Sequence, residues 1–231
     1  MPAASEKPIL FSDPMVRAIL NGEKTVTRRP VVSLVGRRRA GIRYAGKISE
    51  LSHNVMVPSA WAFRDSKGRW HETVPDILPY CPFGVPGDRL WVRETWAPNV
   101  PGCEAQGGYS YRADHFCFDG DGPVRIKWHP SIHMPRAASR LTLEITDIAV
   151  ERVQDITDKD AWNEGIDALD GFFDDADLCA TAQKHGLMVE DAVTTFVHMW
   201  DATYAARGLG WADNPWVWVV RFSVNISGAG S

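Results

Sequence analysis

The sequence predicts an α+β fold in which a mostly antiparallel β-barrel, closed or half-closed, carries flanking helices. Strand patterns occur near the beginning, in the middle and at the end of the 231 residues. Helical patterns lie between them without the regular alternation of a doubly wound sheet. The length suits one large domain, so we expect a single domain over residues 1–226 and a disordered tail at 227–231.

The N-terminal part is predicted to begin with a short helix. The Asp-Pro pair at 13–14 is typical of a helix start, and the Asn-Gly pair at 21–22 of a helix end. A basic loop then leads into a strand near residues 42–48. Residues 50–86 are rich in proline, glycine and tryptophan, which predicts a long irregular insertion.

The middle of the chain carries the clearest strand patterns. Apolar and polar residues alternate over residues 89–96 and again over 139–153, as in strands with one buried face. Between them we expect a second irregular insertion at 97–138, with one short strand at 109–112.

The last third is expected to hold two helices and a closing strand. Thr157 and Asp160 form a capping box, with aspartate in place of the usual glutamate, and open a helix that ends near 164–165. Apolar residues at helical spacing predict a second helix over 190–207. The continuous apolar run at 216–222 is typical of a strand buried on both faces.

The composition is ordinary for a globular protein, with 45% hydrophobic and 23% charged residues. No apolar run is long enough to cross a bilayer and no signal-peptide pattern occurs, so we expect no membrane partner. The four cysteines form no CxxC pair, which is typical of reduced thiols and indicates a cytoplasmic protein.

The charge distribution is uneven although the net charge is only −4. Residues 1–50 hold ten lysines and arginines against four acidic residues, whereas residues 144–191 hold three against fourteen. The N-terminal part therefore has the sign that a polyanion such as RNA prefers. The alternative is that the two regions neutralise each other across the fold.

A basic segment rich in hydroxyl groups, at residues 22–29, is the most distinctive motif. Thr27 offers a hydroxyl nucleophile, and Lys24 becomes a base if burial or the neighbouring arginines lower its pKa. The alternative is a solvated basic edge strand. Nucleotide-binding, zincin and serine-hydrolase motifs are missing from the sequence, and we expect neither a metal nor an organic cofactor.

The G-x-K-x-x-T-x-R spacing at 22–29 resembles the signature of ASCH domains, which belong to the PUA-like β-barrel superfamily. The strand entry at 87–92, the helix segment at 155–164 and the closing strand at 216–222 resemble further elements of that family. The segment at 128–136 is similar to one in longer proteins that phages and prophages often encode. The resemblance thus spans the whole chain, interrupted by the two insertions.

Some members of this superfamily are amidohydrolases that remove the acyl group from N(4)-acetylcytidine. The resemblance implies catalytic roles for Lys24, Thr27 and Glu164, with a modified nucleoside as substrate. Many ASCH proteins carry glutamate at the position of Thr27, so threonine favours an enzyme over a binding module. Glu164 either holds the lysine ammonium or shuttles the proton itself, and these roles compete because a paired glutamate raises the lysine pKa.

Further residues are candidates for contact with the substrate. Besides the three above, we expect these residues to bind it: Arg28, Arg29, Trp91, Arg93, Ser131, His133 and Arg136. Tryptophan rings stack well on bases, and the other tryptophans considered for this role are Trp96, Trp128 and Trp211. The last three residues of the first list lie in a proline-framed loop, a setting that often positions ligands.

Two other functions stay open. A non-catalytic PUA-like module would bind RNA or a modified base through the basic residues 1–50, with strong salt dependence and no turnover. A ribonuclease would use Lys24 and Glu164 to cleave unmodified RNA. For the amidohydrolase we expect Lys24, Thr27 and Glu164 to converge, and the acidic stretch at 170–177 to lie away from their pocket.

Overall fold

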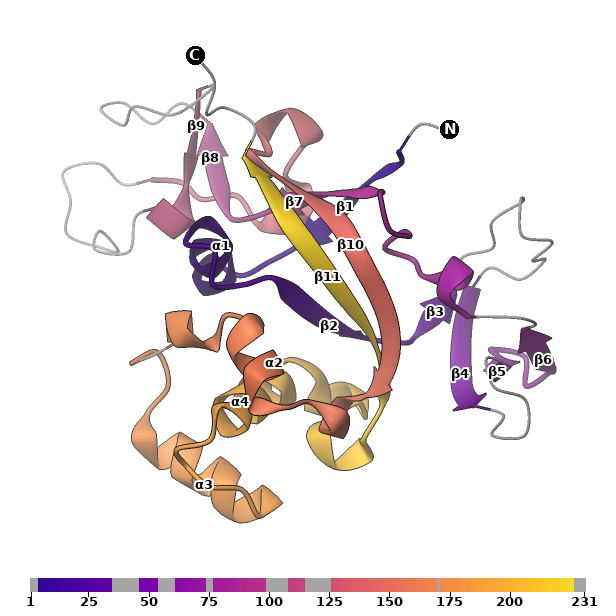
Figure 1. Cartoon of the computed structure of the whole chain (residues 1–231). Coiled ribbons are helices and arrows are strands. Elements are labelled where there is room, and N and C mark those ends of the chain that lie inside the picture. The colour runs from indigo at the N-terminus through magenta and orange to yellow at the C-terminus, as the bar shows by residue number, and fades with distance from the viewer. Residues whose placement is uncertain are drawn as a thin grey trace.

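The computed structural model describes residues 4–34, 46–53, 61–73, 77–98, 108–114, 126–169 and 171–226. The predicted tail at 227–231 and the arginine run at 37–39 lie outside these ranges. Inside them the chain is a mixed α+β fold (Figure 1). None of the described helices has the length and hydrophobicity that a membrane span requires.

Strands lie at both ends and in the middle of the described chain, with the larger helices near its C-terminal third. The strands are β1 (Glu6–Leu10), β2 (Val26–Pro30), β3 (Ser33–Leu34), β4 (Gly46–His53), β5 (Trp61–Asp65), β6 (Trp70–Thr73), β7 (Arg89–Arg93), β8 (Trp96–Pro98), β9 (Tyr109–Tyr111), β10 (Leu141–Arg152) and β11 (Trp216–Ile226). The α-helices are α1 (Asp13–Leu20), α2 (Asp158–Asn163), α3 (Asp175–His185) and α4 (Ala192–Tyr204).

The main sheet has five strands in the order β1-β7-β10-β11-β2, so β1 and β2 are its edges within the described residues. β1 pairs with β7 in parallel, and the other three pairs are antiparallel. The β10–β11 pair is the longest and runs diagonally through Figure 1. The predicted α+β class with mostly antiparallel strands is confirmed, and closure into a barrel stays a prediction.

Both long strands have the burial that their patterns predict. On β10, Leu143 and Ile145 are almost fully buried, whereas Thr146 is exposed. On β11, Val217 and Val219 pack into one apolar cluster while Trp218 packs into another. This two-sided packing explains why the run at the C-terminus is continuously apolar.

The two insertions contain more regular structure than predicted. In the described part of 50–86, β5 and β6 form an antiparallel hairpin, and β4 and β3 extend it to four strands. The irregular structure predicted there is therefore wrong: Trp61 and Phe63 alternate with outward residues, but the run is too short to stand out among prolines and glycines. The strand predicted at 89–96 is split into β7 and β8, and the short strand expected at 109–112 is β9, paired with β8.

Three of the four described α-helices follow the predictions, and α3 does not. Thr157 caps α2 by accepting a hydrogen bond from the Asp160 backbone N–H, at 3.2 Å. α3 lies in a region where no helix was predicted, because Ala182 is its only buried side chain and no apolar stripe marks it. Its ends do carry local signals, with Asp174 as N-cap and Gly186 as left-handed C-cap.

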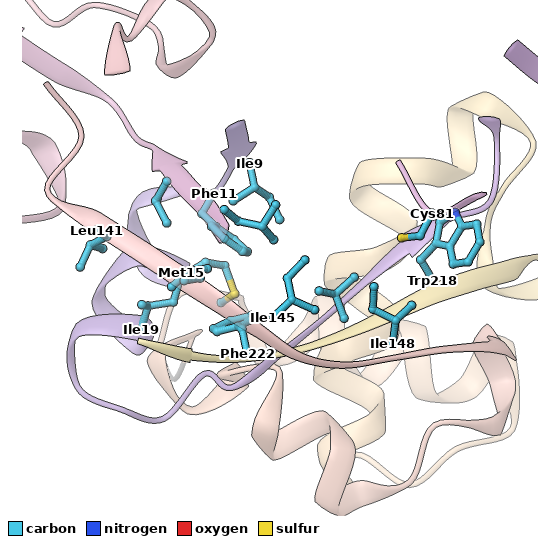
Figure 2. Close-up of a cluster of buried hydrophobic side chains, with 14 of the residues drawn as sticks. Ile9, Phe11, Met15, Ile19, Cys81, Leu141, Ile145, Ile148, Trp218 and Phe222 are labelled. Atoms are coloured by element: carbon cyan, nitrogen blue, oxygen red, sulfur yellow. The ribbon is translucent and has the colours of Figure 1, made fainter. Parts of the chain in front are cut away.

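Two apolar clusters lie on the two sides of β11. Figure 2 shows part of the larger one, in which Phe11 and Met15 approach Phe222 from the α1 side; the Phe11 and Phe222 ring centroids are 6.4 Å apart. The second cluster joins the opposite side of β11 to α2 and α4, and it includes Val26 and Trp200. β2 therefore runs along the sheet edge next to both clusters, and the candidate site lies there.

Candidate functional site

A pocket of about 180 Å³ lies beside β2, at the edge of the main sheet. Its walls come from the start of α1, from β2, from the end of α2 and from one side of α4. The polar and charged side chains that line it are Ser12, Lys24, Thr27, Arg28, Arg29, Glu164, Thr203 and Tyr204. All five predicted residues from the 22–29 segment and from α2 thus reach one pocket.

The turn after α1 sets the position of Lys24. Gly22 has a φ of +79°, a left-handed conformation that glycine adopts without strain. The chain then folds back on the helix end, because the backbone N–H groups of Glu23 and Lys24 both donate to the Ala18 carbonyl. The next residue donates its N–H to the carbonyl of Asn163 at 2.9 Å, which ties the turn to the end of α2.

Glu164 is the C-cap of α2, and the glycine after it allows a close approach. Gly165 has a φ of +79°, and a Cβ atom there would lie 2.7 Å from the Ala18 Cβ and 2.8 Å from the Lys24 Cβ. Any other residue would push the end of α2 away from the α1 turn. The glycine therefore lets two segments 140 residues apart meet side by side.

Lys24 and Glu164 form a buried ion pair in this pocket. The Lys24 Nζ lies 2.8 Å from Glu164 Oε2 and donates to the Glu164 backbone carbonyl at 2.7 Å. The two side chains are 2% and 3% exposed. Burial lowers the pKa of Lys24 below its ordinary value, and the nearby charges of Arg29 and Arg28 add to this, while Glu164 works in the opposite direction.

Arg28 anchors the carboxylates around this pair. Its guanidinium lies 3.5 Å from the second Glu164 oxygen, 3.3 Å from Glu151 and 3.5 Å from Asp160. The side chain is fully buried, so these carboxylates compensate its charge. Arg28 thus holds Glu164 and also lines the pocket, and its contact with a substrate stays a prediction.

Thr27 presents its side chain to the same pocket. It lies in β2 opposite Val220 of β11 and is 3% exposed. None of the hydrogen bonds within the described ranges uses its hydroxyl group. The hydroxyl is therefore available to a bound ligand.

Arg29 closes one side of the pocket by linking the two edges of the main sheet. Its Nη2 donates to the Leu10 carbonyl on β1 at 2.7 Å, and its guanidinium lies 5.3 Å from the Phe11 ring centroid. Its Nη1 is 3.5 Å from the Tyr204 hydroxyl. Among the described residues this guanidinium has no carboxylate partner, in contrast to Lys24 and Arg28.

An aromatic wall from α4 completes the pocket, and the sequence analysis did not identify it as part of the site. Phe196, Trp200 and Tyr204 follow one another at four-residue spacing, and the Trp200 and Tyr204 ring centroids are 4.4 Å apart. The four-residue spacing of these aromatic residues is the sequence signal that could have identified the wall. The tryptophans considered for base stacking do not line the pocket: Trp91, Trp96, Trp128 and Trp211.

Three of the predicted substrate contacts form a separate cluster. The Arg93 and Arg136 guanidiniums lie 4.7 and 6.0 Å from the Trp91 ring centroid, and Arg136 also binds Glu6 at 3.0 Å. Trp91 and Arg93 alternate along β7 with residues of the larger core, so they face away from it. They therefore do not line the pocket beside β2, and their contact with a substrate stays a prediction.

The residues predicted from the proline-framed loop also lie in different places. Ser131 lines a second, larger pocket beside the first, whereas His133 lines neither. The described acidic residues of the 170–177 stretch lie at the start of α3 and line neither pocket, as predicted; Asp170 lies outside the described residues. Within the described ranges no three His, Cys, Asp or Glu side chains gather as a metal site requires.

Comparison with known proteins adds no relative. No protein-family model matches the chain, and no curated protein or solved structure matches it either. Function is therefore inferred from the pocket chemistry and from the motif at 22–29.

Proposed function

We propose that this protein is an amidohydrolase of the ASCH type, which needs no metal and removes the acyl group from N(4)-acylated cytidine or a similar modified nucleoside. One observation carries the proposal. A buried lysine with a lowered pKa, its glutamate partner and an unpartnered threonine hydroxyl line the same small pocket. Amide hydrolysis needs a base, a group that orients it and a nucleophile, and these residues supply all three.

Lys24 suits the role of general base. A neutral amine has two N–H bonds and one lone pair, and the two contacts with Glu164 engage the N–H bonds. The lone pair is then left to accept a proton. Lysine can lose its charge near neutral pH when it is buried, which arginine cannot do.

The proposed reaction has two stages. The Thr27 Oγ attacks the acyl carbonyl carbon while its proton passes to the Lys24 Nζ. The carbon–nitrogen bond then breaks, the proton moves from Lys24 to the departing exocyclic amine, and the acyl group remains on Thr27 as an ester. Water, again deprotonated by Lys24, attacks this ester, and the proton returns to the Thr27 oxygen as the carboxylic acid leaves.

The remaining polar residues act by position. Glu164 orients the amine, and Arg28 in turn holds Glu164. The Arg29 guanidinium faces the pocket without a carboxylate partner, so it can stabilise the negative charge that develops on the carbonyl oxygen. The aromatic wall of α4 offers rings on which the pyrimidine can stack.

The proposal also includes the fold, which we infer to be a half-closed barrel of the PUA-like type. It is supported by the link that Arg29 makes between β1 and β2, the two edges of the described main sheet. A sheet whose edges are close enough for one side chain to span is curled in the way that a half-closed barrel requires.

The direct test is incubation with N(4)-acetylcytidine, with the conversion to cytidine followed by chromatography. Thr27→Val keeps the shape of the side chain and removes the hydroxyl, so turnover should fall to background. Thr25→Val is the matched control, because Thr25 is exposed and does not line the pocket. Absence of cytidine release by the unaltered protein contradicts the proposal. If the Thr27→Val variant keeps its rate, Thr27 is not the nucleophile, and a water molecule activated by Lys24 takes that role.

The second candidate function is a non-catalytic module that binds RNA or a modified base. The Trp91 cluster favours it, because two guanidiniums lie over one indole outside the amidohydrolase pocket. RNA binding that weakens steeply with salt, without turnover of any acylated cytidine, selects this function. Defined products from unmodified RNA select a ribonuclease instead.

A further inference from the structure

The catalytic pocket adjoins a larger one. The second pocket has a volume of about 540 Å³ and shares Leu10, Phe11 and Ser12 with the first. Its other lining residues come from the first turns of α1, from the segment after β7, from the short 3-10 helix Arg112–Asp114, from the proline-framed loop at Ser131 and from the segment before α3. The two pockets therefore lie next to each other along the residues between β1 and α1.

The two volumes indicate which part of a ligand each pocket can hold. Pockets that enclose a whole drug-sized molecule have volumes of about 300–1,000 Å³. The catalytic pocket, at about 180 Å³, is smaller than that and suits one ring with a short acyl group. The larger pocket lies within the range, so the rest of a nucleoside substrate has room there.

Asp13 lines the larger pocket and carries a hydrogen-bond acceptor without a donor. Its Oδ1 is buried and has no hydrogen-bond partner among the described residues, while its Oδ2 lies 3.4 Å from the Arg112 Nε. A buried polar atom that stays unpaired costs free energy, so this oxygen favours a ligand that brings a donor. The hydroxyl groups of a ribose are such donors.

Two arginines give the larger pocket a net positive lining. Arg17 and Arg112 line it, and among the described lining residues Asp13 is the one carboxylate. The Arg17 Nη1 donates to the Ala113 carbonyl at 3.4 Å, which joins α1 to the 3-10 helix that carries Arg112. Hydroxyl groups of Ser12, Thr95 and Ser131 lie in the same lining. Two guanidiniums and several hydroxyl-bearing residues in one pocket lining suit a phosphate group.

We infer that the larger pocket binds the sugar and phosphate of a ribonucleotide, with Asp13 accepting from a ribose hydroxyl and with Arg17 and Arg112 on the phosphate. This inference rests on the proposed function, which places the acylated base in the smaller pocket. The phosphate belongs either to a mononucleotide or to the backbone of an RNA strand. The preferred substrate is thus a phosphorylated cytidine derivative and not the free nucleoside.

The test is a titration calorimetry series with 1-methylcytosine, cytidine, cytidine 5′-monophosphate and a short single-stranded RNA that contains cytidine. The unaltered protein should bind the monophosphate about tenfold more tightly than cytidine, as expected for a charged hydrogen bond. The double variant Arg17→Gln/Arg112→Gln should lose this difference and keep its affinity for cytidine. Arg69→Gln, in the turn between β5 and β6, is the control substitution.

Asp13→Ala tests the sugar contact. It should weaken cytidine several-fold while leaving 1-methylcytosine unchanged, and circular dichroism checks that α1 still folds. Tighter binding of the RNA than of the monophosphate assigns the phosphate to an RNA backbone, and equal binding assigns it to a mononucleotide. Equal affinity of the unaltered protein for cytidine and its monophosphate overturns the inference.

A parallel assay separates this inference from the proposed function. The same variants are tested for release of acetate from N(4)-acetylcytidine and from its 5′-monophosphate. Equal rates on both substrates contradict the phosphate site but keep the amidohydrolase. Phosphate-dependent binding without any acetate release contradicts the amidohydrolase but keeps the larger pocket as a nucleotide site.

Discussion

Two buried glutamates in this protein are paired with cations in contrasting ways. Glu94 is fully buried, and Arg140 donates to both of its oxygens at 3.0 and 2.9 Å. Glu164 is also buried, but its two oxygens have different partners. Lys24 binds one oxygen at 2.8 Å, and Arg28 lies 3.5 Å from the other. Glu164 lines a pocket, whereas Glu94 lines neither of the two pockets described above.

The two glutamate sites differ because Glu94 is paired with an arginine and Glu164 with a lysine. Arg140 also binds both oxygens of Asp114 at 2.8 and 2.9 Å, so it joins three segments of the chain as a permanently charged clamp. Burial raises the pKa of Glu94 in spite of this arginine, and burial lowers the pKa of Lys24 in spite of its glutamate. Desolvation thus favours the neutral form in both places, and in the proposed reaction only the neutral lysine has a use, as the general base.

The largest expected effect comes from exchanging the two cations. Lys24→Arg keeps the charge but removes the base, so turnover of N(4)-acetylcytidine should fall by about 10²–10⁴-fold. Arg140→Lys should leave turnover unchanged and reduce only the free energy of unfolding in urea, because the second hydrogen bond to each carboxylate is lost. An active Lys24→Arg variant contradicts the assignment of Lys24 as the base.

Removing one glutamate charge at a time sharpens the comparison. Glu94→Gln leaves Arg140 buried with one carboxylate fewer, and we expect a loss of about 3–5 kcal/mol in unfolding free energy, with activity kept in the folded protein. Glu164→Gln should cost less stability, because Lys24 can stay neutral and Arg28 keeps two other carboxylates. Because Glu164 orients Lys24 in the proposed reaction, turnover should fall only partly, and a strong loss of turnover would show that Glu164 shuttles a proton instead. Denaturant curves and rates measured on the same samples give both quantities.

Two glycines allow a matched test of the close approach beside Lys24. Gly165→Ala places a Cβ atom against Ala18 and Lys24 in a left-handed conformation, so strain of about 1–2 kcal/mol adds to an overpacking cost of about 1–3 kcal/mol. Gly22→Ala has the same φ of +79° but no atom within 4 Å of the new Cβ, so only the strain remains. Turnover should fall for Gly165→Ala and stay near normal for Gly22→Ala. Equal effects of the two substitutions would show that the α2–α1 contact does not position Lys24.

The smallest effects are the pH dependences, which have opposite signs in the two regions. Between the lowered Lys24 pKa and its ordinary value of 10.5, the unfolded chain holds more protons than the folded one, so stability should rise with pH. Between the ordinary value of 4.5 for Glu94 and its raised pKa, the folded chain holds more protons, so stability should fall as pH rises. Unfolding free energies across pH should lose the first slope in Lys24→Met and the second in Glu94→Gln.

The pH dependence of turnover should follow the protonation of Lys24. Because the base must be neutral, the rate should increase with pH through the lowered Lys24 pKa and level off above it. A rate that keeps rising up to pH 10.5 would show that Lys24 titrates as an ordinary exposed lysine.

The elements that could be predicted from the sequence are those with local causes. The Asp-Pro and Asn-Gly pairs bound α1, Thr157 caps α2, and the alternation at 139–153 produces β10. The β5–β6 hairpin and α3 were missed because a five-residue strand and a helix with one buried side chain carry little periodic signal. Local patterns are reliable only where burial repeats over several turns or pleats.

For the site, the sequence by itself determined the candidate reactive groups of the proposed function: the lysine and threonine three residues apart, and the glutamate at the end of a capped helix. It also determined the four-residue aromatic spacing on α4, without showing that these rings line a pocket. Only the tertiary structure decided that Lys24 and Glu164 meet across 140 residues, with Gly165 as the point of contact. It also placed Trp91 away from them. The physical reason is that burial and pairing depend on which surfaces pack together, and packing joins residues whose separation along the chain carries no local signal.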